Sequence, residues 1–305
     1  MPSVSLPDEV RAACAWVVAR ARSVRVEEKA IGRYAAGLPR EHDGGEPPPF
    51  AEAAPETAAA FAICMNAINF GSGWWPTIRK RPGRSGYGTM AAAISERFAA
   101  AGPWSAGELA AIDAETIAAV LGQAPGHPLM AQFARALRDV GEHIGHDHEG
   151  RFRGPVEAAD SIPALAALFA GWEAFADTSI YEDRAVPFFK RAQITAADLH
   201  RAGIAPLPGI ERLTAFADNL VPHVLRVDGV LDLVPELSAR IEAGELLEHG
   251  SREEVELRAA AVHAVELLAG ASGLSPAAVD SALWNRGGGP RYKSVPRPRS
   301  RNTAY

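Results

Sequence analysis

Aromatic rings, cations and carboxylates are concentrated between positions 186 and 218 of this sequence. The run Val186–Ile194 contains two phenylalanines followed by a lysine and an arginine. Asp198 comes next, and a Leu-Thr-Ala-Phe-Ala-Asp run ends at Asp218. Rings can stack on a heterocyclic base, while fixed cations and carboxylates can stabilise the charges that form as the bond to a sugar breaks. This mixture of residues favours an N-glycosidase.

The same residues resemble the queuosine salvage proteins, a family described as queuosine 5'-phosphate N-glycosylase/hydrolases. The likeness rests on the Phe-Lys-Arg-Ala-Gln-Ile run and on the Leu-Thr-x-Phe-Ala-Asp run. Four ordered blocks of this kind are more specific than one short motif. The further blocks lie at Asn66–Phe70 with Trp74–Trp75, at Phe175 to Tyr181 and at Ser251–Arg258, so the likeness spans residues 55 to 285.

This resemblance implies an aspartate-assisted hydrolysis of queuosine 5'-monophosphate that releases queuine for salvage. It also implies a fold like that of the helix-hairpin-helix DNA glycosylases, in which a catalytic aspartate follows the hairpin. The segment Leu207–Ile210 would then be the hairpin, and Asp218 would be the catalytic residue. Asn219, Leu220 and His200 depart from the family pattern, so the base specificity could differ from that of the family.

Composition limits the class of protein. The chain has 305 residues, 48% of them hydrophobic, which is enough to bury a large core. We expect one all-α domain over residues 1–305, with a basic tail at 286–305 that is either flexible or folded back. No apolar run reaches the roughly 18 residues that span a bilayer, and the start lacks the order of a signal peptide. We therefore expect a cytoplasmic protein with no membrane partner.

The net charge of −6 argues against a nucleic acid polymer as partner. Binding to duplex nucleic acid relies on many lysines and arginines that displace counterions. Two short stretches, the loop at 79–84 and the tail after Asp280, are basic instead, and they suit a small anionic ligand. The sequence therefore predicts a small-molecule substrate.

Amphipathic, alanine-rich stretches predict a mostly helical chain. Ser251 and Glu254 have the spacing of a capping box, at the start of a helix that should end at Gly270. The segment Val224–Val234, with Asp228-Gly229 at its centre, could instead form a β-hairpin. The other predicted helices cover residues 6–22, 56–70, 88–101, 106–122, 128–144, 161–176, 195–202, 209–220 and 275–285.

Asp218 is the candidate catalytic carboxylate. It lies near the end of an apolar run from Ile210 to Phe216, just before Pro222, where the predicted helix stops. A charged group in this position is costly unless it is paired or used. A solvent-exposed or capping role is more common for an isolated aspartate, and the family resemblance favours catalysis. Asp218 would stabilise an oxocarbenium-like sugar and position the attacking water.

Other residues near the two runs would bind the base and the sugar. Lys190 should hydrogen-bond the base or orient Asp198, and Gln193 can offer a donor and an acceptor to a purine-like edge. The resemblance implies a 7-deazaguanine ring, on which Phe188 and Phe216 could stack. The remaining candidate substrate-binding residues are Asn66, Asn69, Phe70, Trp74, Phe175, Asp177, Asp198 and His223.

Each of these candidates also has a plainer interpretation. Lys190 could simply form a salt bridge with Asp198 or Glu182. The phenylalanines could be core residues, Asn69 could cap a helix end, and His223 could bond a main-chain carbonyl. The residues alone leave both interpretations open.

Two basic clusters are candidates for binding a 5'-phosphate. One is the loop from Arg79 to Arg84, which includes Lys80, and the other is the tail that follows Asp280. Guanidinium groups bind phosphate oxygens through paired hydrogen bonds, although most charge runs are only solvated surface. The candidate phosphate ligands are Arg84, Arg297, Arg299 and Arg301.

The sequence predicts neither a metal nor a cofactor. His143, His146 and His148 lie close together, but they lack the helix-spaced pair and the distant acidic ligand of a catalytic zinc site. Cys14 and Cys64 lie in apolar helical patterns, so we expect reduced core residues.

Two alternative functions remain open at this point. A DNA base-excision glycosylase of the helix-hairpin-helix type would share the helical fold and the aspartate, but should present a broad basic face. A non-catalytic queuine- or nucleoside-binding protein would have the same pocket without turnover.

Overall fold

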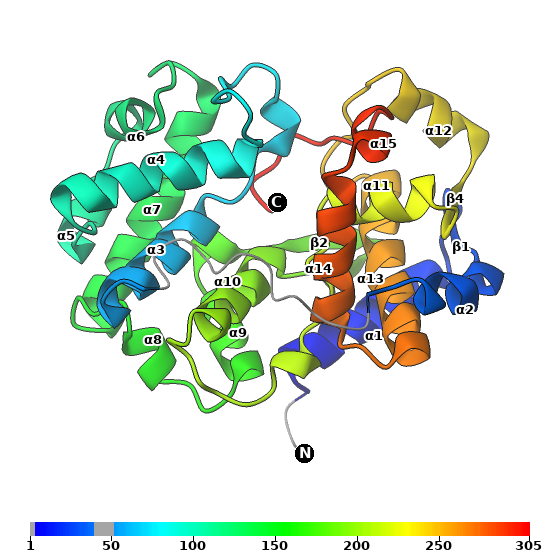
Figure 1. Cartoon of the computed structure of the whole chain (residues 1–305), viewed down its shortest axis with the longest axis horizontal. Coiled ribbons are helices and arrows are strands. Elements are labelled where there is room, and N and C mark those ends of the chain that lie inside the picture. The colour runs from blue at the N-terminus through cyan, green and yellow to red at the C-terminus, as the bar shows by residue number, and fades with distance from the viewer. Residues whose placement is uncertain (1–3, 40–51) are drawn as a thin grey trace.

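A computed structural model of the chain describes residues 4–39 and 52–305, and most of these residues are helical (Figure 1). The first elements are α1 (Leu6–Val18), β1 (Val24–Val26), α2 (Glu28–Ala36), α3 (Pro55–Ala67), η1 (Ser72–Trp74), α4 (Gly86–Ala101), α5 (Ala106–Ala110), α6 (Ala114–Leu121), α7 (Pro128–Asp147), α8 (Gly154–Glu157), α9 (Ile162–Ala170) and η2 (Glu173–Phe175). They are followed by β2 (Thr178–Tyr181), β3 (Arg184–Pro187), α10 (Lys190–Arg201), η3 (Ile210–Arg212), α11 (Leu220–Val227), β4 (Leu231–Leu233), α12 (Pro235–Glu242), α13 (Arg252–Ser272), α14 (Pro276–Gly287) and α15 (Pro290–Lys293).

The helices form two groups that lie side by side in Figure 1, with α3 to α10 in one group and α1, α2 and α11 to α15 in the other. In the first group α5 packs on α7, and α10 packs on α9 and α3. In the second group α13 packs on α1, α2, α11 and α14. The buried apolar side chains of both groups belong to one cluster. The predicted helical fold class is confirmed, while the division into domains and the likeness to helix-hairpin-helix glycosylases stay predictions.

Two small antiparallel sheets complete the described part of the fold. Strands β2 and β3 form a hairpin, whose turn residues Glu182 and Asp183 have φ values of 45° and 63°. The alternative hairpin at 224–234 does not form, because residues up to Val227 belong to α11 and β4 pairs with the distant strand β1. Asp228 ends that helix, and its carboxylate accepts hydrogen bonds from Tyr34 and Tyr292.

The helix predicted over 106–122 is interrupted. Ser105 and Glu108 form a capping box at the start of α5, and Asp113 caps a separate helix, α6, by accepting the N–H of Thr116 at 2.8 Å. The carbonyl of Ile112, between the two helices, accepts a hydrogen bond from Arg138. These local bonds satisfy the main-chain groups that a continuous helix would have used.

The helix predicted over 209–220 is also wrong. Gly209 has a φ of +93°, and only the short turn η3 follows it before the chain becomes irregular from Leu213 to Asn219. In this stretch the main-chain groups of Thr214, Phe216 and Ala217 bond to side chains from other elements. Tertiary hydrogen bonds have therefore replaced the helical bonds that the apolar spacing predicted.

Residues 294–305 run between the two groups of helices, and their path ends near the centre of Figure 1. Ser300, Asn302 and Tyr305 are buried. The main-chain oxygen of Tyr305 accepts the N–H of Gly71, and the main-chain oxygen of Arg299 accepts the N–H of Leu247. The basic tail is therefore packed against both groups.

Gly73 allows this close packing. A Cβ atom placed there would lie 2.1 Å from the main-chain oxygen of Ser300, so neither backbone could accommodate it without moving. We expect Gly73→Ala to lower the free energy of unfolding by about 1–3 kcal/mol or more, as in overpacked cores. Urea unfolding measures this change. The matched control is Gly270→Ala within α13, where a Cβ meets no atom within 4 Å, and helix propensity predicts a small gain in stability. Equal effects of the two variants would contradict the account.

Among the described residues, no single helix combines the length and apolar character needed to cross a membrane. The pair formed by α13 and α14 has that length and composition only when taken together, and it is bent by 109°. Both Cys14 and Cys64 are free and buried, as predicted.

Candidate functional site

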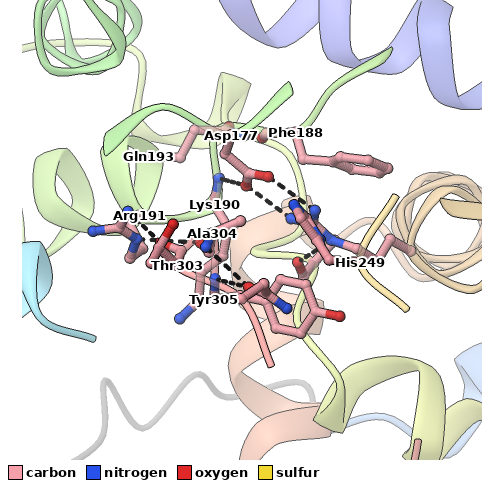
Figure 2. A network of polar contacts seen from close by, with 12 residues as sticks. Asp177, Phe188, Lys190, Arg191, Gln193, His249, Thr303, Ala304 and Tyr305 are labelled. Carbon is pink, nitrogen blue, oxygen red and sulfur yellow. Dashed lines mark hydrogen bonds and ion pairs between the residues drawn. The ribbon is translucent and has the colours of Figure 1, made fainter. Parts of the chain in front are cut away.

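The start of α10 is fixed by a buried ion pair. Asp177, 3% exposed, precedes β2, and both of its carboxylate oxygens accept hydrogen bonds from Arg258 of α13, at 2.8 and 2.7 Å. One of these oxygens also accepts the main-chain N–H of Lys190 at 3.0 Å (Figure 2). Asp177 therefore acts as a cap for α10 from outside the helix.

Arg258 joins this ion pair to the end of the chain. Its guanidinium lies 3.9 Å from the ring centre of Phe188 and 4.5 Å from that of Tyr305, so it is held between two rings. The hydroxyl of Tyr305 donates to Glu254 at 2.7 Å. Glu254 therefore turns toward Tyr305 and the N–H of Gly250, while Ser251 still caps α13.

Arg191 also binds the last residues of the chain, as Figure 2 shows. It is 2% exposed and donates to the main-chain oxygens of Ala67, Thr303 and Ala304. Burial lowers its pKa to about 10. The two neighbouring cations therefore have different roles, because the guanidinium of Arg191 only joins α10 to α3 and to the last residues of the chain.

The irregular segment 213–219 carries Asp218 and is pinned at three successive points. Gln193 exchanges hydrogen bonds with the main chain and hydroxyl of Thr214. Asp280 accepts the N–H of Phe216 at 2.9 Å, and Arg258 donates to the carbonyl of Ala217 at 3.1 Å. Side chains from three helices therefore fix the backbone that positions Asp218.

Asp218 itself is partly exposed. Its Oδ1 accepts the N–H of Leu220 at 2.7 Å and that of Val221 at 3.3 Å, so it caps the start of α11. These bonds fix the direction of its carboxyl group. Its charge also acts on Lys190, Asp280 and Arg297, which come from three other places in the chain.

Lys190 is 5% exposed, and its Nζ donates to the carbonyl of Asn69 at 3.3 Å. Burial lowers the pKa of this amine, and the charge of Asp218 opposes that shift. No carboxylate forms an ion pair with its Nζ in the described part of the chain. A buried amine of this kind is available to a ligand.

A chain of polar side chains links α3, α10 and α14. Asn69 donates to Asn66 at 3.2 Å, and Asn66 donates to Asp198 at 2.9 Å. Asp198 pairs with Arg201 at 3.2 Å, and Arg201 donates to Ser281 of α14 at 3.3 Å. Burial raises the pKa of Asp198. The structure thus brings together the predicted residues Asn66, Asn69, Lys190, Asp198 and Asp218.

Asp280 belongs to the same cluster but was not among the residues predicted from the sequence. It is 4% exposed on α14, and burial together with the charge of Asp218 raises its pKa to about 7. The signal in the sequence was a single carboxylate on the apolar helix Pro276–Gly287. A buried acid on an apolar helix face needs a partner or a use.

Three cations lie near one another beside this cluster. Arg297 is partly buried, which lowers its pKa, and the negative charge of Asp218 opposes that shift. Burial also lowers the pKa of Lys80, to which the positive charges of Arg297 and Lys293 contribute. Mutual repulsion of this kind favours the binding of an anion.

The other predicted phosphate ligands lie elsewhere or are engaged. Arg299 donates to the main-chain oxygens of Trp75 and Gly244. Arg84 is exposed and contributes to the potential at Glu96, and Arg301 is exposed near His127. Of the four predicted arginines, Arg297 is the one that we retain as a phosphate ligand, because the charge of Asp218 acts on it.

Several predicted base-binding residues are buried among protein groups. Both atoms of the Gln193 amide bond to Phe188 or Thr214. Phe175 is 0% exposed and packs on Phe169, while Phe70 packs on Phe133. The ring of Phe188 faces Arg258. Phe216 is 4% exposed, whereas Trp74 is partly exposed. Most of these residues therefore support the site through their contacts with other protein groups.

His223 is buried, and its Nε2 lies 2.9 Å from the main-chain oxygen of Tyr292. Its Nδ1 has no hydrogen-bond partner among the described residues, and burial lowers its pKa.

The predicted histidine cluster around His143 lies on α7. The ring of His143 stacks on Trp172 and forms a hydrogen bond with the carboxylate of Asp147. Residues 4–39 and 52–305 contain no group of three His, Cys, Asp or Glu side chains arranged to hold a metal.

A cavity of about 80 Å³ opens next to Arg191, between Phe70, Arg135 and Glu173. Its lining does not include Lys190, Asp218 or Asp280. The chemistry described above therefore lies outside this cavity.

Comparison with known proteins shows the family of this chain. Residues 49–301 match the family model described as "Queuosine salvage protein". A protein of Sphaerobacter thermophilus named "Queuosine 5'-phosphate N-glycosylase/hydrolase" is 31% identical over 265 residues, which cover 82% of each chain. Proteins with the same name from Dictyostelium discoideum and Bos taurus are 28% and 32% identical, over 82% and 46% of this chain and 79% and 43% of their own. This chain belongs to the queuosine salvage protein family.

Proposed function

We propose that this protein hydrolyses the N-glycosidic bond of queuosine 5'-monophosphate and releases queuine for salvage. The names of the relatives support this enzyme activity. The observation that carries the proposal is the convergence of Lys190, Asp218 and Arg297, which are distant in sequence but interact electrostatically. A buried amine, a capped carboxylate and a partly buried guanidinium together suit a ligand with a base, a sugar and a phosphate.

Asp218 is the catalytic carboxylate in this proposal. Hydrolysis needs stabilisation of a sugar that becomes oxocarbenium-like and removal of a proton from the attacking water. Asp218 can meet both needs, because two main-chain N–H groups at the start of α11 hold its carboxyl group in a fixed direction. Lys190 then offers its hydrogens to the base or to the sugar.

The polar chain from Asn69 to Arg201 provides groups for recognition of the base and the sugar. Asn66 and Asn69 have amide donors and acceptors, and Asp198 accepts hydrogen bonds. Trp74 and Phe216 flank the segments that carry these residues and supply apolar surface. We assign a positioning role to Asp177, Phe188 and Gln193, because their polar atoms or rings already contact other protein groups.

Arg297, Lys80 and Lys293 form the proposed phosphate site. We expect Arg297→Gln to raise the KM for queuosine 5'-monophosphate by about 10–100-fold, because a charge-assisted hydrogen bond contributes roughly 1.5–3 kcal/mol. The KM for queuosine, which lacks the phosphate, should change little. Steady-state kinetics with both substrates measures the difference, and Arg33→Gln on the exposed face of α2 is the control. Equal changes in KM for the two substrates would contradict the assignment.

The proposal requires no metal or cofactor, because water and these side chains supply every group that the hydrolysis uses. It places the reaction in the cytoplasm, with a mononucleotide rather than a nucleic acid polymer or a membrane as partner. The names of the relatives do not favour the alternative of a DNA base-excision glycosylase.

One incubation tests the proposal. The full chain is mixed with queuosine 5'-monophosphate, and free queuine is measured by mass spectrometry. The account predicts catalytic release of queuine together with ribose 5-phosphate. Tight binding without release would instead indicate a nucleotide-binding protein, and a shift of duplex DNA in a gel would indicate a DNA-binding enzyme.

A further inference from the structure

Asp280 lies close to the proposed catalytic carboxylate. Its Oδ1 accepts the N–H of Phe216 at 2.9 Å, two residues before Asp218 in the chain. The charges of Asp218, Arg201 and Lys190 act on it, and all three belong to the cluster described above. Ser281, the next residue of α14, receives a hydrogen bond from Arg201. This part of α14 therefore faces the site.

Several charged side chains of the other elements packed on α14 have partners of their own. These elements are α11, α13, η3 and α15. Arg226 of α11 donates to the main-chain oxygen of Pro296, and Glu266 of α13 pairs with Arg11. Arg212 of η3 pairs with Asp8. Arg286 of α14 itself and Arg291 of α15 both pair with Asp228. Asp218, Arg201 and Lys190 are therefore the groups that control the charge of Asp280.

The two carboxyl groups have different surroundings. Asp218 is partly exposed and accepts two main-chain N–H groups at the start of a helix. Asp280 is 4% exposed and accepts one main-chain N–H, so its ionised form is poorly compensated. Two neighbouring acids in contrasting surroundings are a common arrangement for an acid and a base in one site.

We propose that Asp280 is the acid that protonates the departing base, while Asp218 takes the proton of the attacking water. This inference rests on the proposed function. As the bond between C1' and the base nitrogen breaks, its electron pair stays on that nitrogen, which receives the proton of Asp280. Water adds its hydroxyl to C1', and its proton goes to Asp218. Transfer of that proton from Asp218 to Asp280 restores both groups.

The protonation state of Asp280 agrees with this role. Burial and the negative charge of Asp218 raise its pKa from 3.8 to about 7, so a large fraction of the carboxyl groups hold a proton near neutral pH. An acid catalyst works best when its pKa lies near the pH of the reaction. The pKa adds to the geometry, which already places the carboxyl beside Asp218.

A change of leaving group tests the proposal. Asp280→Asn removes the acidic proton, while the amide oxygen can still accept the N–H of Phe216. We expect this variant to hydrolyse queuosine 5'-monophosphate about 10²–10⁴-fold more slowly. The probe is 4-nitrophenyl β-D-ribofuranoside 5-phosphate, whose nitrophenolate leaves without a proton, and its hydrolysis should slow by less than about 10-fold. Asp232→Asn, on the exposed part of β4, is the control for both substrates.

The wild-type protein provides a second test that needs no variant. Its kcat for the nucleotide should fall as the pH rises through about 7, because Asp280 then loses its proton. The kcat for the nitrophenyl probe should not fall over this range. Matching pH profiles for the two substrates, or equal slowing of both by Asp280→Asn, would overturn the role of Asp280. If the wild-type protein released no queuine at all, the proposed function itself would fail.

Stability gives an independent measure of the same group. A carboxyl whose pKa is raised on folding destabilises the folded state as the pH rises from 3.8 to about 7. The melting temperature of Asp280→Asn should therefore exceed that of the wild-type protein at pH 8 by more than it does at pH 4. A difference that does not depend on pH would show that Asp280 holds no proton and would overturn the proposal.

Discussion

Asp218→Asn should lower the kcat for queuosine 5'-monophosphate by about 10²–10⁴-fold or more, with little change in nucleotide binding. The asparagine oxygen can still accept the N–H groups of Leu220 and Val221, so the start of α11 should keep its shape. In the proposed mechanism, the substitution removes the negative charge that faces the sugar and the group that accepts a proton from water. Single-turnover kinetics measures the rate, and isothermal titration with the intact nucleotide measures the affinity.

The same substitution distinguishes the proposed role of Asp218 from that of Asp280. Because Asp218 does not rely on a leaving-group proton, Asp218→Asn should slow the nucleotide and the nitrophenyl probe to a similar extent, unlike Asp280→Asn. Asp232→Asn on the exposed part of β4 should leave both rates unchanged. Near-normal release of queuine by Asp218→Asn would contradict the role of Asp218.

Arg258→Met should lower the free energy of unfolding by about 3–5 kcal/mol, the largest loss of stability that we expect from one substitution in this site. Arg258 is 1% exposed and donates two hydrogen bonds to Asp177, which would remain buried without its cation. The guanidinium also loses its contacts with Phe188 and Tyr305. Urea unfolding measures the loss.

A second substitution distinguishes a lost contact from an uncompensated charge. Asp177→Asn combined with Arg258→Met removes both charges, and the asparagine can still accept the N–H of Lys190. The double variant should therefore be more stable than Arg258→Met alone. Arg212→Met is the control, because its pair with Asp8 is exposed and should contribute less than about 1 kcal/mol. Simple addition of the two single effects would contradict this account of the ion pair.

The sequence predicted the helices well where local signals control the backbone. Apolar periodicity and caps placed α1, α3, α4, α7, α13 and α14 close to their observed bounds. The failures at 106–122 and 209–220 have different causes. At 106–122 a local cap, in which Asp113 accepts the N–H of Thr116, starts a second helix. At 209–220 the main chain bonds to side chains that are distant in sequence, as when Asp280 accepts the N–H of Phe216, and no local pattern reports such bonds.

The same limit applies to the proposed site. Asp218, Lys190, Asn66 and Asp198 could be chosen from their types and from the family resemblance, and the structure brings them together. Residue type could not show that Asp177 and Gln193 are occupied by protein partners, because those partners lie on other segments. Asp280 was missed because it lies outside the motifs, although a lone acid on an apolar helix was visible in the sequence.

The most direct test of the central claim is the structure of Asp218→Asn with intact queuosine 5'-monophosphate bound. The account predicts that the side chain at position 218 lies within hydrogen-bond reach of a water next to C1', with the phosphate at Arg297 and the base toward Lys190. A nucleotide whose C1' lies away from position 218, on the far side of the base, would contradict the claim.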